Sequence, residues 1–182
     1  MFTKLKKLYF LDFASQKVLS HTTVKYLVVN VLLFAVPIFL GESQIIVGSI
    51  VNFALIYIAL NFKQAKLLPA IFIPAVASIL RNTVLGTATV YLAVLMPFIW
   101  TANGLFIMAI RGLIYKKRSY LISFGLASVL KALFLFICTF VLVSLFKFPT
   151  VLLLAMGVLQ LATAFIASIL YLILFENRKV LK

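Results

Sequence analysis

Acidic and metal-binding side chains are scarce in this chain of 182 residues. It has three Asp+Glu residues, one histidine and one cysteine. The acids Asp12, Glu42 and Glu176 fall in end segments or loops, so no pair of carboxylates lies inside an apolar run. Membrane hydrolases and ion-coupled carriers usually place acids, histidines or metal clusters within the membrane. We therefore expect no enzyme, no metal site and no cofactor, and a membrane enzyme is the least favoured class.

Other missing motifs narrow the function further. The sequence G-x-x-x-x-G-K-[ST], which cradles phosphates, does not occur, so the chain does not bind ATP in that way. Cys138 has no partner for an intrachain disulfide and is expected to be a small buried side chain. His21 has no cysteine, histidine or carboxylate near it in the sequence. If the protein moves a solute uphill, we expect the energy to come from a partner subunit.

Apolar residues dominate what is present. The chain is 65% hydrophobic, with a mean hydropathy of +1.24, well above the roughly half-apolar composition of soluble domains. A membrane-spanning helix needs about 20 mostly apolar residues. Six runs qualify, at residues 24–40, 44–62, 67–85, 87–114, 120–146 and 149–175. The predicted fold class is all-α, a polytopic membrane protein with a compact bundle of six transmembrane helices.

The positive charge predicts how the bundle lies in the membrane. The net charge is +14, and fourteen of the 17 Lys+Arg residues fall in segments that alternate onto one side. By the positive-inside rule both termini are cytoplasmic, and no nucleic-acid partner is needed to explain the charge. We divide the chain into a basic interfacial N-terminal segment (1–23), the transmembrane domain (24–175) and a basic cytoplasmic tail (176–182). Residues 2–13 suggest a helix lying on anionic membrane lipids.

Three polar side chains are the strongest candidates for a binding site. Lys131 is predicted near mid-depth, where a lysine costs about 2.5–3.5 kcal/mol on insertion scales. Arg81 and Asn82 lie together near the outer end of the third run. An outward-opening cavity with these groups would be positive and would favour a small anionic ligand. Alternatively, backbone carbonyls could hold Lys131, and Arg81 could extend to the outer interface.

Six other polar or aromatic residues fall in the outer half or near the middle of the predicted spans. Asn103 could contact a ligand or form a hydrogen bond between helices, and Trp100 could be a stacking wall or simple packing. Pro97, one turn before Trp100, can loosen the helix there. The full predicted substrate-binding set is Lys131, Arg81, Asn82, Asn103, Trp100, Tyr91, Gln160, Asn52 and Gln44.

Across about residues 24–175 the chain resembles the substrate-binding S components of energy-coupling factor (ECF) transporters. The similarity rests on six short-looped spans with both ends inside, and on the segments "VGSIVNFALIYIAL" (47–60), "LLPAIFIPAVASILRNTVLG" (67–86) and "LMPFIWTANGLFIMAIRGL" (95–113). It implies a plasma-membrane protein that binds a vitamin-like or metal-related solute near the outer face. It also implies a transmembrane T component and two cytoplasmic ATPases as partners, with Glu42, Ser43 and Gln44 in a lid.

One feature departs from this resemblance. Many S components carry a small-x-x-x-small patch on the first helix, where the T component docks. Here Ala35 is the only small residue of that helix before Gly41. A second interpretation therefore stands beside the first, in which the protein is a membrane subunit for assembly of a larger complex and binds no solute of its own.

Overall fold

The computed structural model describes residues 21–85 and 89–176, without the side chains of residues 82–90 and of His21, Gln64 and Glu176. Within these residues the chain forms helices and no strand. The elements in order are α2 (His21–Phe39), α3 (Gln44–Asn61), η1 (Gln64–Lys66), α4 (Leu68–Leu85), α5 (Thr89–Tyr115), α6 (Tyr120–Phe146), α7 (Val151–Leu153), η2 (Leu154–Val158), α8 (Leu159–Tyr171) and η3 (Leu172–Glu176).

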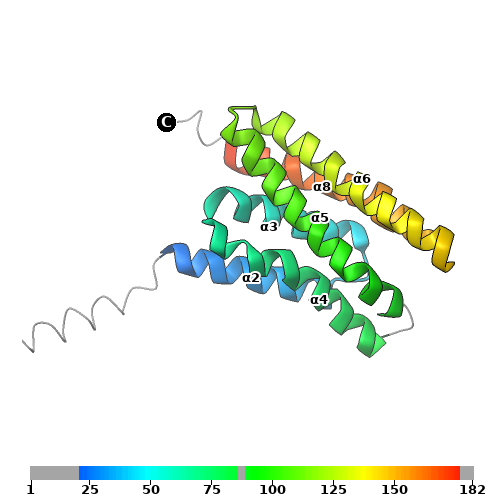
Figure 1. Ribbon diagram of the computed structural model, residues 1–182. Coiled ribbons are helices and arrows are strands. Elements are labelled where there is room, and N and C mark those ends of the chain that lie inside the picture. The colour runs from blue at the N-terminus through cyan, green and yellow to red at the C-terminus, as the bar shows by residue number, and fades with distance from the viewer. Residues whose placement is uncertain (1–20, 86–88, 177–182) are drawn as a thin grey trace, which may run out of the picture.

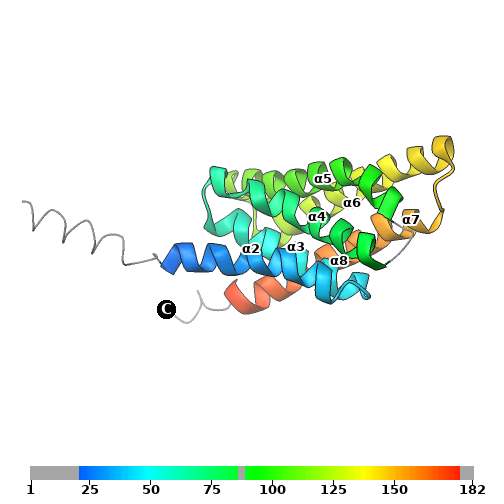
Figure 2. The same cartoon turned by 90° about the horizontal axis from the view of Figure 1, so that it is seen from below.

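The helices run up and down along a common direction, with short connections between them (Figures 1 and 2). One end of the bundle holds the start of α2, the α3–α4 connection, the α5–α6 turn and the end of η3. The opposite end holds the α2–α3 and α6–α7 connections, the end of α4 and the start of α5. The first and last described residues therefore lie at the same end.

Local sequence signals set several helix boundaries. The Ser43 hydroxyl accepts a hydrogen bond from the Ile46 amide, and Ser119 does the same for Ile122, so both serines cap a helix N-terminus. The α5–α6 turn places Lys117 in the left-handed region at φ 57°. Hydrogen bonds from the Lys117 and Arg118 amides back to α5 close this turn as a Schellman motif, which satisfies the last carbonyls of the helix.

The predicted spans agree closely with the helices. Five described segments are long and apolar enough to cross a membrane: Thr22–Phe39, Gln44–Asn61, Tyr91–Tyr115, Tyr120–Phe146 and Val151–Phe175. A sixth apolar segment, Leu68–Arg81, is shorter. The protein is thus an all-α, multi-pass membrane protein. The predicted N-terminal interfacial helix and the tail from residue 177 lie outside the described residues.

The largest buried cluster fills the half of the bundle nearest the described termini. It includes Leu55 of α3, Phe62 just after that helix, Ile110 of α5, Phe124 of α6 and Tyr171 of α8. Exposed large apolar side chains cover much of the outside of the bundle, which is typical of helices that face lipid. The helix pair α3–α8 has the most extensive contact, and small buried residues of α8 support it: Thr163, Ala164, Ala167 and Ser168.

Irregular backbone is concentrated in the other half. Pro74 and Pro97 lie inside α4 and α5, where each removes one hydrogen bond of the helical ladder. The hydroxyls of Ser78 and Thr101 each donate to the carbonyl of the proline four residues before, at 2.9 and 2.8 Å. The π-helical segment η2 interrupts the last apolar run, and such segments widen a helix locally.

Candidate functional site

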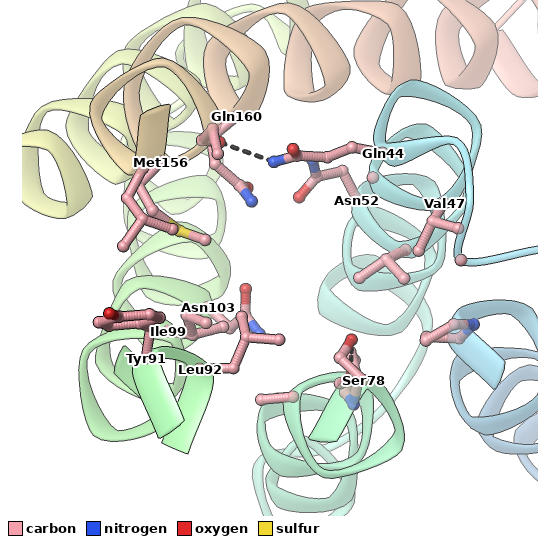
Figure 3. Close-up of a pocket in the computed structure, with 18 of the residues that line it drawn as sticks. Gln44, Val47, Asn52, Ser78, Tyr91, Leu92, Ile99, Asn103, Met156 and Gln160 are labelled. Carbon is pink, nitrogen blue, oxygen red and sulfur yellow. Dashed lines mark hydrogen bonds between the residues drawn. The ribbon is translucent and has the colours of Figure 1, made fainter. Parts of the chain in front are cut away.

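A cavity of about 570 Å³ lies in the irregular half of the bundle. Figure 3 shows side chains from α3, α4, α5, η2 and α8 pointing toward a common space. Its volume falls in the range of roughly 300–1,000 Å³ that is usual for small-molecule sites. Most of its wall is apolar, with contributions from Val47, Val51, Leu92, Ile99 and Met156. Seven of the nine residues predicted from sequence line it: Gln44, Asn52, Arg81, Tyr91, Asn103, Lys131 and Gln160.

Lys131 is the deepest charged group of this lining. Its side chain is 2% exposed, and it comes from the middle of α6. Nζ donates a hydrogen bond of 2.6 Å to Oδ1 of Asn52 and lies 5.3 Å from the centroid of the Phe106 ring. Both contacts favour a cation, but neither is an anion, so the ammonium charge has no carboxylate partner here.

Asn52 is held in place by a second contact. Its Nδ2 donates 3.1 Å to Oγ1 of Thr163, and that hydroxyl donates 3.1 Å to the carbonyl of Gln160. This arrangement turns the amide oxygen of Asn52 toward Lys131. Gly48 allows it, because a Cβ there would come within 2.8 Å of the Thr163 side chain. The close approach of α3 and α8 therefore fixes the position of the lysine's partner.

Arg81 lies at the end of the cavity that is nearest the α2–α3 loop. Its side chain is 15% exposed, and its Nη2 lies 3.9 Å from the carboxylate of Glu42, which is 94% exposed. Nη1 is buried and makes no hydrogen bond. The guanidinium packs against Gly41, where a Cβ would overlap it. Arg81 thus lines the cavity at its loop end and also reaches the exposed Glu42, so both interpretations of this residue remain open.

The remaining lining residues combine structural contacts with access to the cavity. Gln44 Nε2 donates 2.7 Å to the carbonyl of Ala155, which joins the start of α3 to η2. Asn103 Nδ2 donates 3.2 Å to the carbonyl of Ile71, so the interhelical hydrogen bond weighed from sequence does form. Tyr91 packs edge-on against Phe148, with ring centroids 4.9 Å apart.

Trp100 corrects the prediction, because it does not line the cavity. Its Nε1 donates 3.2 Å to the carbonyl of Phe72, and its ring meets Phe72 edge-on at 4.9 Å. Ile99 and Asn103, one turn apart on α5, point to the cavity. Residue 100 is rotated by about a quarter turn from Ile99 and faces α4. The side chain of Asn82 lies outside the described residues, so its predicted role stays a prediction.

Three residues that shape this site were not predicted from the sequence. Thr163 was not among the predicted site residues, although its hydroxyl anchors Asn52. The other two are Gly41 and Gly48, whose missing side chains make room for Arg81 and Thr163. A glycine four residues before a buried polar residue, as in Gly48 and Asn52, is the signal that could have indicated this packing.

The charge balance decides what the cavity can hold. The lining within residues 21–85 and 89–176 contains Lys131 and Arg81 but no aspartate or glutamate. An isolated cation in an apolar environment is costly, and an anionic ligand would supply its counter-charge and accept its free hydrogen-bond donors. The arrangement suits binding of a small anion with an apolar body. We found no constellation of His, Cys, Asp and Glu in the described part of the chain that could hold a metal ion.

Comparison of the chain with known protein families, with curated proteins and with solved structures gives no match.

Proposed function

We propose that this protein is a membrane-embedded solute-binding subunit, similar in role to the S component of an ECF-type importer. It captures a small, anionic, vitamin-like solute in the cavity between α3, α4, α5, α6 and α8. The observation that carries the proposal is Lys131, buried in a cavity wall and held by neutral Asn52, with no acidic residue among the described lining. A charge kept at this cost in a cavity of ligand size supports a role in binding.

The distribution of charge supports access from the outer side. Seven described basic residues belong to the end of the bundle opposite the cavity: Lys25, Lys63, Lys66, Arg111, Lys116, Lys117 and Arg118. By the positive-inside rule that end faces the cytoplasm, and the cavity half faces outward. Under this proposal both termini are cytoplasmic and the protein resides in the plasma membrane.

Release of the solute to the inside would need partners. The chain has no phosphate-cradling motif, so ATP hydrolysis would be supplied by other subunits. Following the resemblance, we propose a transmembrane T component and two cytoplasmic ATPases. The surface that would contact the T component is not the small-residue patch of the first helix seen in many S components, because α2 lacks it.

The test is native mass spectrometry of the gently purified protein, followed by extraction and identification of any bound small molecule. We expect one anion bound per chain in the wild type and its loss in Lys131→Met. The matched control is Lys147→Met, the same change on an exposed lysine at the end of the same helix and outside the cavity lining. It should keep the solute.

Two results would contradict the proposal. If Lys131→Met retains the solute, the solute does not bind through Lys131 in this cavity. Wild-type protein that copurifies with other membrane subunits but never with a solute would favour the assembly interpretation. In that case Lys131, Asn52 and Thr163 would serve only to join α3, α6 and α8.

A further inference from the structure

We infer that the solute carries two acidic groups, one at each end of an apolar middle part. This inference rests on the proposed function and names the substrate class of the same cavity. It follows from two cationic groups, Lys131 and Arg81, that lie at opposite ends of one apolar-walled space.

The deep end presents one ammonium group. Lys131 has three N–H donors, and one of them is used in the hydrogen bond from its Nζ to Oδ1 of Asn52. Asn52 is itself held by Thr163, so the ammonium is fixed rather than free to swing. One acidic group of the solute can accept the remaining donors here.

The end near the α2–α3 loop presents the guanidinium. Glu42 approaches Arg81 only through Nη2, at 3.9 Å and from an exposed position. Nη1 is buried against Gly41 and has no hydrogen-bond acceptor, while the Arg81 side chain belongs to the lining of the same cavity. The one carboxylate near this guanidinium is thus distant and exposed, and a second acidic group on the solute would give the guanidinium a closer partner from the cavity side.

The two cations are too far apart for one carboxylate. Arg81 packs against Gly41, just before α3 begins at Gln44, whereas Lys131 bonds to Asn52, eight residues further along that helix. Eight residues of α-helix rise about 12 Å. Apolar side chains such as Val47, Val51 and Ile99 line the space between them. A single small anion would leave one of the two cations without a partner.

The experiment compares two series of probes on the full-length protein in detergent. Linear α,ω-dicarboxylates of increasing chain length are titrated beside the monocarboxylates of equal length, and dissociation constants are measured by calorimetry. We expect the best dicarboxylate to bind about tenfold or more tighter than its monocarboxylate, since a charged hydrogen bond contributes on that scale. Affinity should peak at the length that spans the gap.

Variants assign each acidic group to one end of the cavity. Arg81→Gln should reduce the dicarboxylate to the affinity of the monocarboxylate and leave the monocarboxylate unchanged. Lys131→Met should weaken both series, and Lys147→Gln should change neither. Arg81→Lys keeps the charge and should retain part of the preference for the dicarboxylate. Thermal unfolding of each variant without ligand shows whether Arg81→Gln is folded, so a folding defect can be told apart from a loss of binding.

The outcomes separate this inference from the proposed function. Equal affinities for the two series, or no dicarboxylate binding, would overturn the inference of a two-ended acid. The proposed function would survive that result if native mass spectrometry still finds a solute that depends on Lys131. Absence of a bound solute together with no binding in either series would overturn both.

Discussion

The two halves of this bundle use the same helices in opposite ways. Near the described termini, buried side chains such as Phe62, Phe124 and Tyr171 pack together into one hydrophobic core. In the other half the helices enclose a cavity of about 570 Å³ with two cationic groups on its wall. We call the half near the described termini the packed half, and the half that contains the cavity and the two cationic groups the cavity half.

Backbone geometry explains much of the difference. Pro37, Pro74 and Pro97 and the π-helical segment η2 all belong to the cavity half, and Pro37, Pro74 and η2 contribute to the lining. In the half near the described termini, the irregular segments are η1, in the α3–α4 connection, and η3, in the last described turn. Interruptions of the hydrogen-bond ladder let helices bend or widen, so close packing is lost where they gather.

The two halves should contribute differently to the stability of the fold and to the affinity for a solute. In lipid the hydrophobic effect does not hold helices together, so packing and interhelical hydrogen bonds must do so. The packed half then sets the stability of the fold, while the cavity half sets the affinity for a solute. Variants in the two halves should separate these two properties.

The largest effect on stability is expected from Phe124→Ala. Phe124 is fully buried and packs against the rings of Tyr120 and Tyr171. Loss of the ring leaves a void that costs about 2–4 kcal/mol, somewhat less than in water because lipid also accepts apolar groups. The midpoint of thermal unfolding in detergent should fall. The affinity of the folded fraction for the probe acid, meaning the dicarboxylate that binds wild type best, should be unchanged. A parallel loss of this affinity would show that the two halves are coupled.

Gly48→Ala should affect both properties, because Gly48 lies where the cavity meets the α3–α8 contact. A Cβ there would approach Thr163 within 2.8 Å, and such overpacking costs about 1–3 kcal/mol. It should also shift Asn52 and weaken binding of the probe acid. Gly112→Ala is the matched control, since no heavy atom lies within 4 Å of its added Cβ. Higher helix propensity should leave that variant up to about 1 kcal/mol more stable.

The smallest effect is expected from Thr163→Val, which keeps the shape of the side chain but removes the hydroxyl that holds Asn52. Probe-acid affinity should fall about fivefold, equal to about 1 kcal/mol for one hydrogen bond. Unfolding should change little, because Asn52 lines the cavity, where water can replace the lost contact. Ser168→Ala is the control on the same helix, since that hydroxyl bonds only its own helix at Ala164. Equal effects of both changes would contradict a specific role for Thr163.

The amino-acid sequence by itself determined the helices and the depth of their polar residues. The fixed thickness of a bilayer makes an apolar run a reliable measure of a spanning helix, and α6 begins and ends at the predicted residues. Depth follows from the rise per residue, so Lys131 could be placed near mid-depth before any contact was known.

Only the tertiary structure decided which face of each helix points inward. Helices that are apolar all round carry no polar stripe to mark their outer side, so nothing in the pattern separated Trp100, which meets α4, from Ile99, which lines the cavity. Likewise, the contact of Asn52 with Thr163, 111 residues away, depends on how closely α3 and α8 approach at Gly48. Rotation and approach of helices are set by packing between distant segments, which no local pattern contains.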